Sequence, residues 1–185
     1  MQHPNLARID GVSLSLRLAQ PQDAAFIHAL RMDPTYNAHL SAVTGTVQDQ
    51  TDWIRLYKTR EAEGTEYYYV IERRLDAQPC GLVRLYDITS DQFTWGSWIL
   101  DRNKPPKAAL ESAVLIYQIG FERLGKSLSV FDVRRDNVRT LAFHARFGAT
   151  EIGSDDQDVI FNYHATQFAD DFDGHMAALT PYLLE

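Results

Sequence analysis

Three consecutive strand-like segments between residues 66 and 100 constrain the fold of this chain more than any other feature. The segments are EYYYVIERR (66–74), CGLVRLYDI (80–88) and FTWGSWIL (93–100), and all are rich in the aromatic and β-branched residues that favour strands. The short polar stretches LDAQP and TSDQ separate them and are typical of hairpin turns. The pattern predicts three antiparallel strands that form a meander.

The rest of the chain alternates predicted helices and strands around this meander. Alternating apolar residues predict a first strand over 12–19. Two apolar stripes on the helix that follows the meander predict that this helix packs on a sheet. We expect a single domain over 1–185 of the α/β (α+β) class, with one mixed, mostly antiparallel central sheet and flanking helices. The remaining predicted elements are helices at 23–32 and 46–63, the long helix ending at Gly125, a strand at 127–133, a helix at 137–148, a hairpin over 149–168 and a tail helix over about 172–184.

Composition excludes several classes of function. The 185 residues are 45% hydrophobic and carry a formal net charge of −7, with no run of more than two Lys or Arg, so we expect neither nucleic-acid nor membrane binding. Cys80 is the single cysteine, which rules out an internal disulfide, and the six histidines lack the spacing of a metal site. No apolar stretch approaches the length of a membrane span. We expect a cytoplasmic protein without a metal, as a monomer or a homodimer.

One motif and the order of elements resemble the GNAT acyltransferase superfamily. The segment FDVRRDNVRTLAFHARFGA (131–149) resembles the family's strand followed by N-x-x-[ST]-x-x-[LF]-[YE] and Gly, with Asn137, Thr140, Phe143, His144 and Gly148 in register. The resemblance covers roughly residues 12–166. The long helical insert between the first two strands is similar to that of the ribosomal-protein N-acetyltransferase branch.

The resemblance implies an acetyl-CoA site between splayed fourth and fifth strands, here 94–100 and 127–133. The cofactor would contact Trp98, Ile99 and Leu100 on one side, and Asn137, Thr140 and Phe143 on the other.

The family binds pyrophosphate at a helix start written [QR]-x-x-G-x-[GA], where this chain has the sequence KPPKAA. The central Gly is Lys107, and Pro105 and Pro106 have no amide to donate. Proline suits the first turn of a helix, so the segment still predicts a helix start. Lys104, Lys107, Ala108 and Ala109 would then hold the diphosphate through ammonium groups and amides. The alternative is a rigid solvated turn.

The resemblance also suggests catalytic residues. His144 occupies the position of a family Tyr that can protonate the departing thiolate, and an imidazolium could do the same; alternatively, His144 only packs. For the general base, the sequence offers Glu72, Asp87, Glu111 and Asp132. We place Asp87 first, because it lies next to the turn toward the fourth strand. Asp132 is second, since it could simply bond a neighbouring turn.

Aromatic residues on adjacent predicted strands suggest the acceptor class. Tyr86, Trp95 and Trp98 would form a wall suited to a sugar or nucleotide. We predict an N-acetyltransferase that moves an acetyl group from acetyl-CoA to a primary amine of a small molecule, such as an amino sugar or a nucleotide-linked amino sugar. The alternatives are a protein N-terminal acetyltransferase and a non-catalytic ligand-binding member of the fold.

Overall fold

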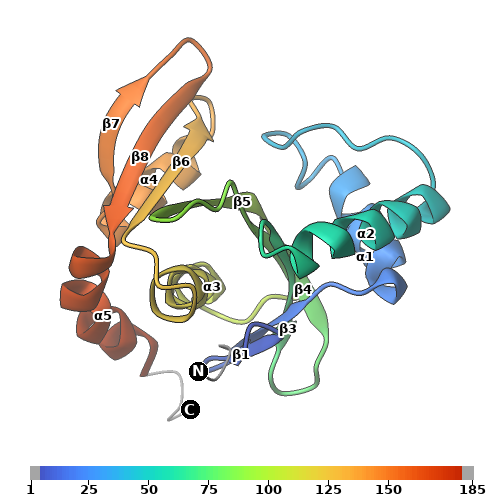
Figure 1. The fold of residues 1–185 in the computed structure, drawn as a ribbon, viewed down its shortest axis with the longest axis horizontal. Coiled ribbons are helices and arrows are strands. Elements are labelled where there is room, and N and C mark those ends of the chain that lie inside the picture. Colours follow the sequence, from blue (N-terminus) through green and yellow to red (C-terminus); the bar gives the residue numbers. More distant parts are fainter. Residues whose placement is uncertain (1–4, 181–185) are drawn as a thin grey trace.

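The computed structural model describes residues 5–180, and Figure 1 shows how its elements are arranged. Its helical elements are the short 3₁₀ helix η1 (Pro21–Asp23), α1 (Ala24–Met32), α2 (Val47–Ala62), α3 (Ala108–Tyr117), the π-helical segment η2 (Gln118–Arg123), α4 (Val138–Phe147) and α5 (Ala165–Leu179). Its strands are β1 (Arg8–Asp10), β2 (Leu14–Leu18), β3 (Tyr67–Arg73), β4 (Pro79–Tyr86), β5 (Gln92–Leu100), β6 (Leu128–Arg134), β7 (Thr150–Ser154) and β8 (Asp158–His164).

The eight strands form one open sheet in the order β1-β2-β3-β4-β5-β6-β8-β7. All neighbouring strands are antiparallel except β5 and β6, which are parallel. The predicted meander is β3-β4-β5, and the mostly antiparallel sheet with flanking helices is confirmed. The short strand β1, which pairs with β2, was not expected, because three residues give too short an alternation to recognise.

Helices cover both faces of the sheet. On one face, Ile27 of α1 and Ile54 of α2 pack with Val70 and Leu82 of the sheet. The other face belongs to a larger cluster, in which Leu115 and other residues of α3 meet inward-facing side chains of β2 to β5. The long helix therefore packs on the sheet as its two apolar stripes predict.

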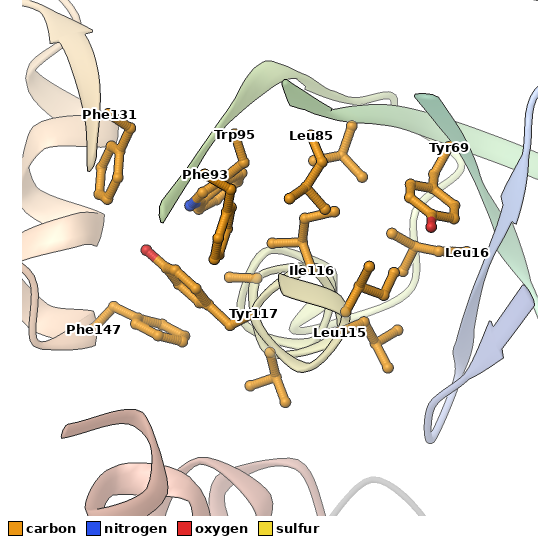
Figure 2. Packing of buried hydrophobic residues seen from close by; sticks show 14 of the residues in the cluster. Leu16, Tyr69, Leu85, Phe93, Trp95, Leu115, Ile116, Tyr117, Phe131 and Phe147 are labelled. Carbon is orange, nitrogen blue, oxygen red and sulfur yellow. The ribbon is translucent and has the colours of Figure 1, made fainter. Parts of the chain in front are cut away.

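Tyr117 lies where α3 joins the two halves of the sheet. Its ring is fully buried, and its centroid is 5.5 Å from that of Trp95 and 5.3 Å from that of Phe147. Figure 2 shows this side chain extending from α3 toward Phe131 and Phe147, with Phe93 beside it. The core is therefore continuous beneath the point at which β5 and β6 meet.

The helix after β5 changes its geometry near its end. A π-helical segment continues α3 from Gln118 to Arg123. Within it, Gly120 lies so close to the ring of Phe93 that a Cβ atom there would overlap the ring. Gly125 then follows with φ +67, a conformation that favours glycine. This residue ends the helix as predicted.

The chain end differs from expectation. The last strand stops at His164, and the tail helix α5 starts at Ala165 rather than near residue 172. Phe168 is buried against the core, so a residue read as part of a strand instead anchors the first turns of the helix. Residues 181–184 of the expected helix lie outside the described part of the chain. Within residues 5–180, no helix combines the length and apolar character needed to cross a membrane.

Candidate active site

A cleft opens where β5 and β6 separate. The two strands pair only at Gln92–Leu128 and Phe93–Ser129, and beyond these pairs they diverge, as Figure 1 shows. The strands predicted to splay apart, at 94–100 and 127–133, are β5 and β6. Their separation is thus present in the structure. A cavity of about 300 Å³ lies in the gap, lined from β5 by Trp95 to Trp98 and from β6 by Phe131 to Arg134.

A bulge in β5 faces this cleft. Arg84 of β4 is opposite Gly96, whereas Leu82 is opposite Ile99. Two residues of β5 therefore stand against one of β4, and the first of them, Ser97, has φ +48. A bulge leaves its extra residue out of the ladder. Backbone N–H and C=O groups of β5 at this bulge are therefore not all paired with β4. An extended ligand in the cleft could form hydrogen bonds with them.

The helix α4 closes one wall of the cleft. The side chain of its N-cap residue Asn137 accepts a hydrogen bond from the amide of Thr140 at 3.3 Å, which explains the Asn-x-x-Thr spacing as a cap. Gly148 ends the helix with φ +116. Asn137, Thr140 and His144 all line the cleft. Three residues of the sequence motif therefore meet at one site.

His144 is buried among aromatic rings and is uncharged at neutral pH. Only 3% of the residue is exposed, and its ring centroid lies 4.5 Å from that of Phe131 and 5.4 Å from that of Trp95. Burial lowers the pKa of His144 to about 4, because an imidazolium is poorly solvated there. The position agrees with the expected site, but the imidazolium expected at neutral pH is not formed. Its Nδ1 is buried without a hydrogen-bond partner among residues 5–180.

The proline-containing turn has a left-handed backbone conformation at the position where the family pattern has glycine. Lys107, which stands at the position of the central Gly, is the N-cap of α3 and has φ +58 and ψ +16. Left-handed geometry of this kind is easy for glycine and costs other residues about 1–2 kcal/mol. The amide of Ala108 donates to the carbonyl of Pro105 at 3.3 Å. The helix start is thus retained despite the changed sequence.

The two lysines of this turn have different environments. Lys104 lines a second cavity of about 310 Å³ next to the cleft, whereas Nζ of Lys107 donates to the carbonyl of Ala178 in α5 at 2.6 Å. Arg139 and Arg146 of α4 also line this second cavity. Sequence reasoning missed these two arginines, although their spacing of seven residues places them on one helical face.

Of the other residues expected to contact the cofactor, some line the second cavity and some are buried in the core. The second cavity is also lined by Trp98, Leu100, Ala109, Thr140 and Phe143. The side chains of Ile99 and Ala108, by contrast, are buried in the core. Ile99 packs with the α1–α2 side of the sheet, so only its backbone could face a ligand.

Two of the four carboxylates considered as bases are held in structural contacts. Glu72 pairs with Arg17 at 2.5 Å. Glu111 accepts hydrogen bonds from the amides of Ser13 and Leu14 at 2.8 and 3.0 Å and is 2% exposed. Both carboxylates lie away from the cleft and are already satisfied, which leaves Asp87 and Asp132.

Asp132 is the better placed of these two. It lines both the cleft and an adjoining cavity of about 270 Å³ that also contains Asp87. Burial raises the pKa of Asp132, and the neighbouring carboxylate of Asp158 adds to this effect. Asp87 lines only the adjoining cavity and has φ +48. We therefore prefer Asp132 to Asp87 as the candidate general base, which reverses the order expected from the sequence.

The aromatic wall forms as predicted. Tyr86, Trp95 and Trp98 all line the cleft. Trp95 is almost completely buried and contacts Trp98 edge-on, with ring centroids 5.2 Å apart. The guanidinium of Arg84 lies 4.5 Å from the ring centroid of Tyr86. Tyr86 and Trp98 thus present the more accessible rings.

Sequence reasoning missed the loop that covers the cleft. Residues 33–46, between α1 and α2, contribute Tyr36, His39, Leu40 and Ser41 to its lining. Nδ1 of His39 lies 3.1 Å from a carboxylate oxygen of Asp136, beyond the end of β6. The loop therefore contacts the far wall of the cleft. No residue pattern in this polar stretch signals such a role.

Comparisons with known proteins agree with this architecture. The family model of the acetyltransferase (GNAT) domain matches residues 13–150. The structure of apo FdhC, described as a nucleotide-linked sugar GNAT, is 38% identical with a TM-score of 0.85, over 91% of this chain and 96% of that chain.

Two further solved structures share the fold at low identity. Ribosomal-protein-S5-alanine acetyltransferase from Vibrio fischeri is 12% identical with a TM-score of 0.72, over 85% of this chain and 96% of that chain. A variant of the spermidine N-acetyltransferase SpeG from Vibrio cholerae is 18% identical with a TM-score of 0.70, over 85% of this chain and 96% of that chain. No curated protein matches the sequence.

Proposed function

Because the chain belongs to the GNAT acetyltransferase family, we propose that this N-acetyltransferase moves the acetyl group of acetyl-CoA to the amine of a nucleotide-linked amino sugar. The observation that carries the proposal is that two neighbouring cavities share part of their lining. Trp98 and Thr140 line both the cation-lined cavity and the aromatic-walled cleft. A cofactor with a charged end and a reactive end could therefore lie across both.

The two ends of acetyl-CoA would meet different residues. Lys104, Arg139 and Arg146 would hold its phosphates, because cations form strong charge-assisted bonds to phosphate oxygens. The extended arm would lie along the bulged part of β5 and bring the thioester to the wall that contains His144. In this arrangement the side chain of Lys107 holds α5 rather than the phosphates.

Transfer of the acetyl group needs a neutral amine and a leaving thiolate. The amine attacks the thioester carbon, a C–N bond forms, the C–S bond breaks and the amine loses a proton. We propose Asp132 as the base that takes this proton, since a carboxylate with a raised pKa is a better proton acceptor. Uncharged His144 would donate a hydrogen bond toward the sulfur.

Two observations support a sugar as the acceptor. Tyr86 and Trp98 suit the ring faces of a sugar. FdhC, which is 38% identical to this chain, is described as a nucleotide-linked sugar GNAT. Cys80 is buried and free, which fits our proposal of a cytoplasmic location.

One observation favours a polyamine as the second candidate. The cavity next to the cleft is lined by Asp87, Asp132, Asp155 and Asp158, and carboxylates attract a polycation. Two of these are engaged, however: Asp155 accepts from the amides of Gln157 and Asp158 at 2.8 Å each, and Asp158 lies 3.5 Å from Arg134. The cavity therefore offers a polyamine fewer carboxylates than its lining suggests.

A thiol-release assay with acetyl-CoA tests the proposal. The acceptor panel contains nucleotide-linked amino sugars, the corresponding free amino sugars, spermidine and peptides with a free N-terminus. We expect turnover with the amino sugars. Release of CoA with spermidine or peptides alone would replace the proposal by the polyamine or the protein reading, and no release with any amine would favour a non-catalytic role.

A further inference from the structure

A separate cavity of about 370 Å³ lies between the helical layer and the sheet. It is lined by residues of α1, α2, the loop that joins them, and the strands β3 and β4. Its lining includes His28, Arg31, Trp53, Tyr68 and Arg84. None of these residues belongs to the cleft between β5 and β6.

The lining carries more positive than negative charge, although the whole chain has a formal net charge of −7. Arg31 and Arg84 are its guanidinium groups, and Asp49 is its carboxylate. The Asp49 carboxylate is engaged, because it accepts from the amide and the hydroxyl of Thr46 at 2.7 and 2.8 Å. Glu66 does not line the cavity but pairs with Arg84.

That glutamate cannot neutralise both of its partners. Glu66 is 3.1 Å from Nε of Arg84, but it also lies 2.6 Å from Nε of Arg60. One carboxylate is thus shared between two guanidinium groups, and it is nearly buried. Positive charge therefore remains at Arg84, in addition to that of Arg31.

Three buried polar atoms on this lining lack hydrogen-bond partners among the described residues. They are Nε of Arg31, Nε of Arg84 and the hydroxyl of Tyr68, although Nε of Arg84 lies within ion-pair distance of Glu66. Tyr68 is only 1% exposed, and the nearby guanidinium of Arg31 partly offsets the rise that burial causes in the pKa of its hydroxyl. A buried polar group without a partner is unfavourable. Beside two guanidinium groups, an anionic ligand with several acceptor oxygens would supply what is missing.

The cavity adjoins the cleft in which acetyl transfer is proposed. Ser41 lines both spaces, and its carbonyl accepts from Nη2 of Arg31 at 3.0 Å. On the sheet side, the guanidinium of Arg84 stacks on Tyr86, which lines the cleft. A ligand held by the arginines would therefore continue past an aromatic ring toward Asp132.

We propose that this cavity binds the diphosphate of a nucleotide-linked acceptor through Arg31 and Arg84, with the nucleoside toward Trp53 and the sugar amine directed into the cleft. This inference rests on the proposed function, since it names where the same substrate is recognised. Two guanidinium groups match the two charges of a diphosphate and repel a polyamine. A free amino sugar would leave the cavity unused.

Binding measurements that do not depend on turnover test the inference. Titration calorimetry of the full chain with uridine diphosphate and thymidine diphosphate is expected to show saturable binding of at least one. Arg31→Gln and Arg84→Gln should each weaken it tenfold or more, because each removes a charge-assisted contact. Their affinity for CoA should stay unchanged, which also shows that the variants are folded.

Arg55→Gln is the matched control, because Arg55 lies on α2, is 62% exposed at its side chain and pairs with Asp52 outside the cavity. An equal loss of affinity in this variant would overturn the inference. So would the absence of binding at millimolar nucleotide by the unaltered protein. Inorganic pyrophosphate that binds as tightly as the nucleotides would overturn the assignment of the nucleoside to this cavity.

The proposed function can fail separately from this inference. Acetylation of a nucleotide-linked amino sugar that Arg31→Gln and Arg84→Gln leave unchanged would retain the proposed function and remove the diphosphate site from this cavity. Arginine-dependent binding of nucleotide without acetylation of any amino sugar would retain the site and remove the function.

Discussion

Replacing His144 by Phe should remove a pH-dependent part of the stability of this protein. A histidine in an unfolded chain titrates near pH 6.5, whereas burial lowers the pKa of His144 to about 4 in the folded state. Between these values the unfolded chain binds a proton that the folded protein excludes, so stability rises with pH. The contribution is present above pH 6.5 and is lost as the pH falls toward 4.

The magnitude follows from the two pKa values. A pKa difference of one corresponds to about 1.4 kcal/mol, so the wild-type protein should lose up to about 3 kcal/mol between pH 7 and pH 4 that His144→Phe does not lose. Urea denaturation at pH 7, 6, 5 and 4 measures the free energy of unfolding of both proteins. Titrations elsewhere in the chain cancel in the difference between them.

Phe147→Leu is the matched control, because Phe147 is buried in the same cluster and has no proton to bind. It should destabilise the protein by a similar amount at every pH. Parallel pH profiles for the wild-type protein and His144→Phe would refute the reasoning, and would mean that the imidazole is solvated or paired. His144 could then carry a proton at neutral pH after all.

Three further outcomes are expected. Lys107→Val should be about 1–2 kcal/mol less stable than Lys107→Gly in urea denaturation, because φ +58 suits glycine and both variants lose the bond to Ala178; equal stability would contradict the strained turn. Lys104→Glu should weaken CoA binding tenfold or more in calorimetry, whereas Lys107→Glu should change it little, and equal weakening by both would contradict their separate environments. Asp132→Asn should lower kcat by ~10²–10⁴-fold at unchanged CoA affinity, whereas Asp155→Asn in the adjoining cavity should not; an unaltered kcat would remove Asp132 as the base.

Local patterns were enough to predict most of the fold. Aromatic and β-branched residues between turn signals predict β3 to β5, because such side chains suit the buried surface of a sheet. The two apolar stripes predict how α3 packs, because they mark its buried side. The start of α5 was misplaced because Ala165 to Phe168 fits a strand or a helix equally well over four residues. Only the packing of Phe168 against the core decides between them.

Less of the active site than of the fold could be predicted from the sequence, because the chemistry of each site residue depends on its neighbours in space. The register of Asn137, Thr140 and His144 located one wall, but the charge state of His144 follows from aromatic neighbours on β5 and β6. The two lysines of the turn look equivalent in the sequence, and α5 distinguishes them. The cavity lined by Arg31 of α1 and Arg84 of β4 brings together residues more than 50 positions apart in the sequence. No local sequence pattern could predict it.

The most direct test of the central claim is the ratio of kcat/KM for a nucleotide-linked amino sugar to that for the same free amino sugar, at saturating acetyl-CoA. Contacts of a diphosphate with two guanidinium groups should favour the linked acceptor by ~10²-fold or more. The ratio should fall by at least tenfold in Arg84→Gln. A ratio near one, or a preference for the free sugar or for spermidine, would contradict an acetyltransferase that recognises its acceptor through a nucleotide.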